Sequence, residues 1–290
     1  LEQKMAKINI NGALLEYNQN GQGDPLVFVH GSASDSRTWH NQMDEFSTKY
    51  RVITYSRRYH WPNERIPENT DYSMEEHVDD LRAFLHKLDA VPAHLVGHSY
   101  GAFLCLLLAM REPQLVRSLV LAEPPAITLF VSSTPKPNEL FKLLITRPRT
   151  TVAIIKFGAG GLTPAKKAAK RDEAEKANRL FGKEILGKTF YRNLSKARRE
   201  QINANFIKAE LLGSGFLPLD EQQIRNVKIP TVLITGRHSH RLFHRLTDRL
   251  QELLPDSERF EIERASHIMH EDNPAEFNDV VKSFLELHQH

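Results

Sequence analysis

Short apolar runs alternate with amphipathic stretches along the first part of the chain, and each kind of run predicts a secondary-structure element. An amphipathic stretch predicts a helix over 73–88, and a continuous apolar stretch predicts a buried helix over 102–111. Strands that are apolar along their whole length are typical of a parallel sheet covered on both faces by helices. The pattern therefore predicts an α/β fold. The predicted strands lie at residues 8–10, 13–17, 26–29, 52–55, 94–97 and 119–122.

This alternation stops at Glu123-Pro124-Pro125, because two consecutive prolines cannot continue a strand. It resumes only at Ile229-Pro230. The intervening sequence predicts helices over 164–181 and 195–212, the first of which is expected to begin at Thr163-Pro164 as N-cap and first residue. A long helical stretch between two strands predicts an inserted lid.

We therefore divide the chain into a core domain of residues 1–123 and 219–290 and a helical cap of residues 124–218. Asn273-Pro274 has the residue types of an N-cap and first helical residue, and so predicts the start of the last helix. The other elements predicted after the cap are a strand over 231–235, a helix over 242–254 and a strand over 259–262.

Composition and charge exclude several classes of function. The chain has 39 Lys and Arg against 36 Asp and Glu, and this balance is too even to indicate nucleic-acid binding. Its single cysteine, Cys105, lies in an apolar run, so a reducing compartment is expected. There is no leader-like pattern and no apolar run of roughly 18–20 residues, the length of a membrane span. The chain is therefore predicted to be soluble and cytoplasmic, without a membrane partner.

The strongest chemical signal is Gly97-His98-Ser99-Tyr100-Gly101, a G-x-S-x-G motif between a predicted strand and a predicted helix. A sharp strand-to-helix turn exposes the central serine hydroxyl, and glycines on either side let the strand and helix approach closely. The helix N-terminus also places partial positive charge near the serine. Ser99 is therefore the predicted nucleophile.

A second signal is His30-Gly31-Ser32, which directly follows a buried strand. Acyl transfer needs two N–H donors directed at the developing oxyanion. The backbone N–H groups of Ser32 and Tyr100 are the predicted donors. His30 is expected to shape the turn rather than take part in the chemistry, and Trp39 is expected to pack.

A serine needs a base to take its proton, and His267 is the preferred candidate among the histidines. It lies after the last predicted strand and before the last helix, which fits the chain order serine, acid, histidine. His98 is expected to point away from the pocket, and His270 is expected at the surface. The histidines of the remaining group lack the carboxylates, cysteines and spacing of a zinc motif, so no metal is predicted; they are His238, His240 and His244.

Taken together, these features resemble the α/β-hydrolase family, and the resemblance covers essentially the whole chain. The residues that carry it are the His-Gly turn at 30–31, the motif at 97–101, Ile-Pro-Thr at 229–231 and Ser-His at 266–267. The resemblance implies an eight-stranded, mostly parallel sheet, a cap inserted after the sixth strand, and a triad of serine, histidine and an acid.

The position of the acid departs from the commonest family pattern. Where many members read Gly-x-x-Asp, this chain has Ser239 in place of the Asp. Some branches of the family carry the acid after the strand that follows the nucleophile helix, and Glu123 occupies that place. Glu123 is therefore the predicted acid, which would hold His267 in the correct tautomer. Asp248, Asp220 and a dyad without an acid remain open alternatives.

Two charged regions are candidates for a role in substrate recognition. Arg57 and Arg58 stand where many family members have a glycine-rich loop, and are expected to be structural or solvent-facing. The segment 166–199 is rich in Lys and Arg, and a solvated helix face is favoured over steering of an anionic substrate. Phenylalanines of the cap are expected to bind it to the core; they are Phe130, Phe141, Phe157, Phe181, Phe190, Phe206 and Phe216.

The function predicted from these residues is hydrolysis of a small or medium carboxylic ester or lactone through an acyl-enzyme on Ser99, without a cofactor. In this family an Asp in place of Ser99 would indicate an epoxide hydrolase or a haloalkane dehalogenase, so the serine argues against both. Hydrolysis of C–C bonds, perhydrolysis and amide cleavage use related serine sites and remain open. A ligand receptor with little turnover is an alternative of a different class.

Overall fold

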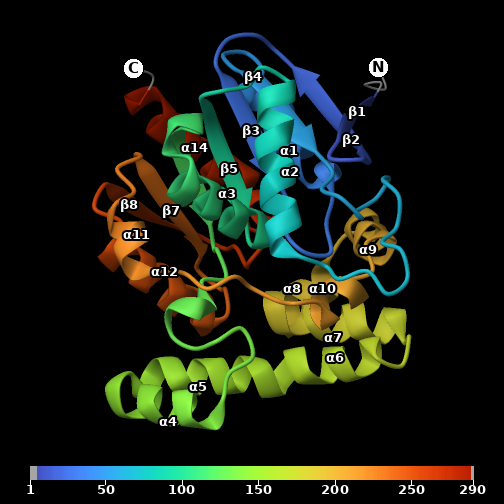
Figure 1. Ribbon diagram of the computed structural model, residues 1–290, viewed down its shortest axis with the longest axis vertical. Helices are drawn as coiled ribbons and strands as arrows, with labels where there is room; N and C mark the ends of the chain where they lie inside the picture. The colour runs from blue at the N-terminus through green and yellow to red at the C-terminus, as the bar shows by residue number, and fades with distance from the viewer. Residues whose placement is uncertain (1–4, 289–290) are drawn as a thin grey trace.

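The computed structural model describes residues 5–288, which fold around one sheet of eight strands (Figure 1). The order across the sheet is β1-β2-β4-β3-β5-β6-β7-β8. β2 runs antiparallel to β1 and β4, and all other neighbouring strands are parallel. The predicted mostly parallel sheet is confirmed. Its strands are β1 (Ala6–Ile10), β2 (Ala13–Asn20), β3 (Pro25–Val29), β4 (Arg51–Tyr55), β5 (Ala93–His98), β6 (Val116–Ala122), β7 (Thr231–Gly236) and β8 (Ser257–Ile262).

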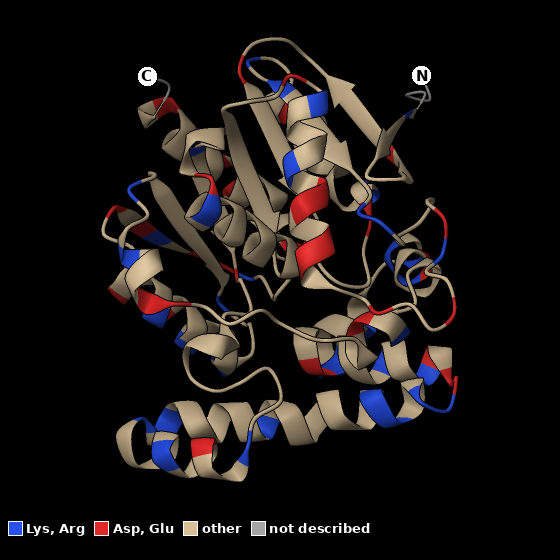
Figure 2. Ribbon diagram, viewed as in Figure 1, with Lys and Arg blue, Asp and Glu red and all other residues tan. Residues whose placement is uncertain are grey.

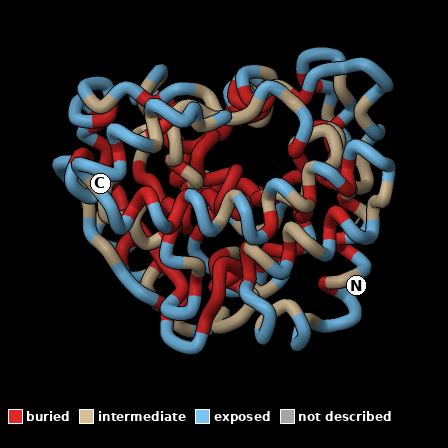
Figure 3. Tube along the Cα trace, turned by 90° about the horizontal axis from the view of Figure 1, so that it is seen from below, coloured by how far each residue is buried: buried red, intermediate tan, exposed pale blue. Residues whose placement is uncertain are grey.

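Helices cover both faces of this sheet because its central strands are apolar on both sides. Along β3, Val27 and Val29 pack on one face while Leu26 and Phe28 pack on the other. Buried residues accordingly concentrate in the middle of the molecule (Figure 3). The first face is covered by α2 (Met74–Lys87), α3 (Tyr100–Arg111), α11 (Glu221–Arg225) and α12 (Arg241–Leu253). The second is covered by α1 (His40–Phe46) and α14 (Pro274–Leu287).

Most of the chain between β6 and α11 forms a layer of helices at one end of the molecule, the lower end in Figure 1, while α9 lies above this layer in the same view. The helices of this segment are α4 (Pro137–Thr146), α5 (Pro148–Phe157), α6 (Thr163–Ala169), α7 (Ala174–Leu186), α8 (Lys188–Asn193), α9 (Lys196–Ala204) and α10 (Lys208–Leu212). The remaining short elements of the chain are η1 (Ser36–Trp39), η2 (Pro113–Leu115), η3 (Ile127–Leu129) and α13 (Met269–Asp272). No helix within residues 5–288 has the length and apolar character that crossing a membrane requires.

Helix boundaries in this layer differ from those predicted. Thr163 does not cap a new helix, because a π-helical turn over Gly158–Leu162 joins α5 to α6 without a break. The predicted helix over 164–181 is instead interrupted before α7, where Asp172 has a φ of 59°. Ser195 does act as an N-cap, since its side chain accepts a hydrogen bond from the Arg198 amide. The helix predicted over 195–212 is nevertheless divided into α9 and α10, with residues 205–207 between them. In the core, by contrast, Asn273 and Pro274 are the N-cap and first residue of α14, as predicted.

Apolar clusters that contain both aromatic and aliphatic residues pack the inserted layer against the core. Most of the phenylalanines expected in this role lie in apolar clusters, but Phe141 is 65% exposed and its predicted packing role is wrong. More Lys and Arg than Asp and Glu line α4, α5 and α6 (Figure 2). Most of the cations over 166–199 are exposed, as predicted; Lys166 and Arg199 are half-buried, and Arg198 is buried.

Gly101 sets how closely α3 approaches β3, and it supplies a test of this packing. A Cβ at residue 101 would lie 2.1 Å from the Val29 carbonyl oxygen, a backbone atom that cannot rotate away. We expect Gly101→Ala to lower the free energy of unfolding by about 1–3 kcal/mol or more. A Cβ at Gly158 meets nothing within 4 Å, so Gly158→Ala should leave stability unchanged or raise it. The free energies of unfolding of both variants can be measured in urea. Equal values for Gly101→Ala and Gly158→Ala would contradict the close packing of α3 on β3.

Candidate active site

Ser99 lies in the turn between β5 and α3, at φ 51° and ψ −119°. A left-handed φ is strained for a non-glycine residue, and such strain is frequent at functional sites. The turn is fixed from both sides: the Ser99 amide donates to the Ala122 carbonyl over 2.8 Å, and the Ser99 carbonyl accepts from the Phe103 amide over 3.1 Å. The local geometry is thus the strand-to-helix turn that the glycine motif predicts.

The turn at residues 30–32 lies against Ser99. A Cβ on Gly31 would be 2.9 Å from the Ser99 Cβ, so only glycine permits this approach. Ser32, Ser99 and Tyr100 line one cavity, and Tyr100 opens α3, where backbone N–H groups are unsatisfied by the helix. This arrangement is compatible with the predicted oxyanion donors at Ser32 and Tyr100.

Arg57 holds the turn at residues 30–32 in place. Its guanidinium donates to the carbonyls of His30 over 3.1 Å and Gly31 over 3.0 Å, and to the Tyr72 hydroxyl over 2.7 Å. The Arg57 amide also donates to Nε2 of His30 over 2.9 Å. Arg57 and His30 are both buried and structural, which agrees with their predicted roles. Arg58 is likewise structural, since it is buried and paired with Asp80.

Glu123 and His267 meet beneath the carboxyl ends of β6, β7 and β8. Glu123 follows β6 with a φ of 48°, and its Oε2 forms a short hydrogen bond with Nδ1 of His267. Its Oε1 accepts from the Gly236 amide over 2.9 Å. When Nδ1 donates to Glu123, Nε2 of His267 is left as an acceptor. His267 and Ser99 line the same narrow cavity of about 30 Å³, which brings candidate base and candidate nucleophile together.

The other acids considered from the sequence lie elsewhere. Asp248 pairs with Arg259, and Asp220 accepts from the Gln223 amide as the N-cap of α11. Ser239, which replaces the usual Asp, is buried near Glu123. Its hydroxyl partly offsets the rise that burial causes in the pKa of Glu123. Of the three acids considered, Glu123 is the one that contacts His267.

Burial governs the electrostatics of this pair. Loss of solvent raises the pKa of Glu123, whereas the Ser239 hydroxyl and the Gly236 amide oppose that rise. Loss of solvent also lowers the pKa of His267, and the nearby Arg198 guanidinium lowers it further. The imidazole is therefore neutral at pH 7 and able to accept a proton. Its ring is further fixed by Phe243, which stacks on it at 4.1 Å between ring centroids.

Two further histidines lie next to His267. His98 is buried and lines the small cavity together with Ser99 and His267. Its Nε2 hydrogen-bonds the His267 carbonyl over 2.7 Å and so helps to hold the backbone at the candidate base. The prediction of a surface position for His270 is wrong: it is fully buried, 4.4 Å from the ring of Trp39, with Nε2 on the Thr38 hydroxyl. The one-turn helix after His267 folds inward over the core, which the sequence pattern did not reveal.

His238, His240 and His244 lie at or near the surface. Across residues 5–288, no group of three or more His, Cys, Asp or Glu is placed to hold a metal ion.

The buried histidines make stability depend on pH. Burial lowers the pKa of each well below its ordinary value near 6.5, so the unfolded chain binds more protons below that pH. Each such histidine then costs about 1.4 kcal/mol of stability per pH unit below 6.5. Buried carboxyls such as Glu123 and Glu210 have raised pKa values and act in the opposite direction, but they are fewer. The histidines are His30, His60, His77, His94, His98, His267 and His270.

We therefore expect the melting temperature to fall by roughly 10 °C or more between pH 7 and pH 5.5. Calorimetry at pH 6 in two buffers of different ionisation enthalpy should report net proton uptake on unfolding. A melting temperature that stays constant over this range, or proton release on unfolding, would contradict the buried, neutral state of these histidines.

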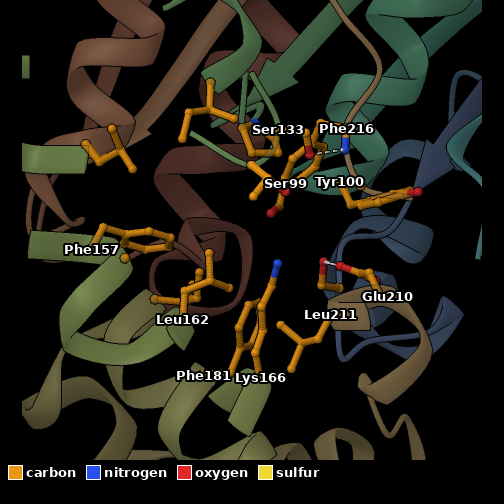
Figure 4. Close-up of a pocket in the computed structure, with 18 of the residues that line it drawn as sticks. Ser99, Tyr100, Ser133, Phe157, Leu162, Lys166, Phe181, Glu210, Leu211 and Phe216 are labelled. Atoms are coloured by element: carbon orange, nitrogen blue, oxygen red, sulfur yellow. Dashed lines mark hydrogen bonds between the residues drawn. The ribbon is translucent and has the colours of Figure 1, made fainter. Parts of the chain in front are cut away.

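A larger cavity of about 160 Å³ extends from Ser99 toward the inserted helices (Figure 4). Its wall is mostly apolar and includes Phe157, Leu162 and Phe181. Two charged side chains also reach it, Lys166 from α6 and Glu210 from α10. Neither residue belongs to a recognisable motif, since it is the fold that brings both of them to the cavity beside the Ser99 turn.

Comparison with known proteins agrees with this architecture. Residues 24–274 match the family model described as alpha/beta hydrolase fold. An uncharacterized hydrolase of Bacillus subtilis, YraK, is 31% identical over 46% of this chain, and the match spans only about half, 49%, of YraK. Epoxide hydrolase 3 of Xenopus tropicalis is 26% identical over 90% of this chain and 71% of its own. The carboxylesterase CesB of Bacillus subtilis has a similar fold, with a TM-score of 0.73 at 20% identity, covering 98% of this chain and 92% of CesB.

Proposed function

The chain belongs to the α/β-hydrolase fold family, and from that premise we propose that it is a serine hydrolase of small or medium carboxylic esters or lactones. The observation that carries the proposal is the hydrogen bond of Glu123 to Nδ1 of His267, an imidazole that lines the same small cavity as Ser99. A buried carboxyl group, a neutral imidazole and a serine in a strained turn are the three side chains that acyl transfer requires.

In the proposed reaction, Ser99 Oγ attacks the acyl carbon while Nε2 of His267 takes the serine proton. Glu123 holds the imidazole and stabilises its protonated form. The backbone N–H groups of Ser32 and Tyr100 stabilise the negative charge on the carbonyl oxygen. The imidazolium then gives its proton to the leaving alkoxide. Water, activated by the same imidazole, releases the acid from Ser99.

The helices between β6 and β7 supply the substrate-binding wall in this proposal. Residues 124–218 form the cap, and residues 5–123 and 219–288 form the hydrolase domain that carries the reacting groups; the outermost residues of the predicted domain, 1–4 and 289–290, lie outside the described part of the chain. The support is the position of the larger cavity, whose wall combines Ser99 from the core with residues of α5, α6 and α7. Substrate size is then set by the cap.

Ring opening of an epoxide is a weaker candidate, although one relative is an epoxide hydrolase. Its usual nucleophile in this family is an Asp, and this chain has Ser99. C–C bond hydrolysis and perhydrolysis use a serine and stay as alternatives to be separated by substrate.

Hydrolysis of p-nitrophenyl esters from acetate to octanoate tests the proposal. Steady turnover of at least one ester, well above the rate in buffer, is expected. A burst of one equivalent of nitrophenol without further turnover would instead support a ligand receptor that is acylated once. Absence of both burst and turnover, across the series and with aryl lactones, would contradict the proposal.

A further inference from the structure

The cavity above Ser99 has an uneven distribution of charge. Of the side chains of residues 5–288 that line it, only Lys166 and Glu210 carry a formal charge. Figure 4 shows the Lys166 ammonium pointing from α6 into the cavity, toward the side where Ser99 lies. Glu210 lies at another part of the wall, below Tyr100 in this view, with its carboxylate on the Ser32 hydroxyl.

The Glu210 carboxylate is already compensated by the protein. Its Oε1 accepts a short hydrogen bond from the Ser32 hydroxyl, and its Oε2 lies 3.9 Å from the buried Arg57 guanidinium. A carboxylate and a guanidinium at this separation cancel most of each other's field. The Glu210–Arg57 pair therefore contributes little net charge to the cavity.

The positive charge of Lys166 is not neutralised by a nearby carboxylate among the described residues. No carboxylate within residues 5–288 forms an ion pair with it, and its charged neighbour is another cation, Lys170. The Lys166 side chain is partly buried, and loss of solvent lowers its pKa. A desolvated ammonium regains favourable interactions when an anion binds beside it. The cavity thus carries a net positive charge opposite the candidate nucleophile.

We propose that Lys166 is a specificity-determining residue that binds an anionic group, most simply a carboxylate, on the substrate that Ser99 attacks. This inference rests on the proposed function and narrows its substrate class. The substrate is then an ester with an apolar chain that carries one carboxylate, such as a monoester of a dicarboxylic acid. The chain lies against the apolar wall and the free carboxylate pairs with Lys166 in the cap.

Lys167 offers a matched control on the same helix. It is exposed and does not line the cavity, so Lys167→Met removes the same charge from the cap without touching the proposed contact. A general attraction of anions to the basic cap would respond to both substitutions. A contact with Lys166 responds only to Lys166→Met and is restored in part by Lys166→Arg.

The test compares mono-p-nitrophenyl esters of glutarate to suberate with neutral analogues in which a carboxamide replaces the free carboxylate. For at least one chain length, kcat/KM of wild type should be at least tenfold higher for the anionic ester. This ratio should fall about tenfold or more in Lys166→Met and stay as in wild type in Lys167→Met. Equal ratios in wild type and Lys166→Met overturn the proposal. A preference for p-nitrophenyl 6-aminohexanoate also overturns it, because it would show that Glu210 determines the preferred substrate charge.

Binding provides a readout that does not depend on hydrolysis. In calorimetry, 4-phenylbutyrate should bind wild type at least tenfold more tightly than 4-phenylbutanamide, and Lys166→Met should abolish the difference. If no ester is hydrolysed but this difference is present, the esterase proposal fails and the anion site stands. If neutral esters are hydrolysed but neither assay depends on Lys166, only the anion site fails.

Discussion

Ser99→Ala should lower kcat/KM for the best ester by on the order of 10⁵-fold, because the variant cannot form the acyl-enzyme. A residual rate above that in buffer is expected from the oxyanion donors and substrate binding. Removing one hydroxyl from the strained turn should change the melting temperature little. The measurement is steady-state hydrolysis of the ester that wild type cleaves fastest.

Ser214→Ala is the matched control for this substitution. Ser214 also lines the cavity, but it is exposed and its hydroxyl donates to Asp71 over 2.6 Å. The Ser214→Ala variant should therefore retain activity within a few-fold of wild type. If Ser99→Ala retained a comparable rate, the reaction would proceed through another nucleophile or by direct attack of water.

Glu123→Gln should lower kcat by about 10³–10⁴-fold with little loss of folding, because the amide favours the wrong imidazole tautomer. The Gly236 amide needs an acceptor at residue 123, so the Gln oxygen is expected to face Gly236. The Gln NH₂ then faces Nδ1 of His267, which must accept, and the proton moves to Nε2. A protonated Nε2 cannot accept the Ser99 proton.

Asp248→Asn and Asp220→Asn are the controls, since these acids were the other candidates. Both lie in surface interactions away from His267 and should retain near-normal kcat. Loss of activity in either variant, together with normal rates in Glu123→Gln, would move the acid away from Glu123. Equal activity of all three variants would indicate a dyad of Ser99 and His267.

The parts of the fold predicted from the sequence are those fixed by local patterns. Each predicted strand is present because an apolar run between turn residues has few other ways to bury itself. The turn at Ser99 was predictable because glycines at 97 and 101 are required by contacts with adjacent backbone. Asn273-Pro274 predicted the start of α14 for a similarly local reason.

The features that sequence reasoning missed depend on contacts between distant segments. Thr163-Pro164 has the composition of a helix start, but the preceding glycine-rich stretch continues as a π-helical turn. His270 is polar and follows a loop, yet it packs against Trp39 and Thr38. Lys166 is one of many cap lysines in the sequence, and only the fold turns it toward the cavity.

The proposed nucleophile, Ser99, and its activation by His267 can be tested by covalent labelling. Wild type is incubated with a fluorophosphonate, and its peptides are then identified by digestion and mass spectrometry. We expect one phosphonyl adduct, on the peptide that contains Ser99, with no adduct in Ser99→Ala and much slower labelling in His267→Ala. An adduct on a different residue, or a wild-type protein that turns over esters without labelling, would show that Ser99 is not the nucleophile.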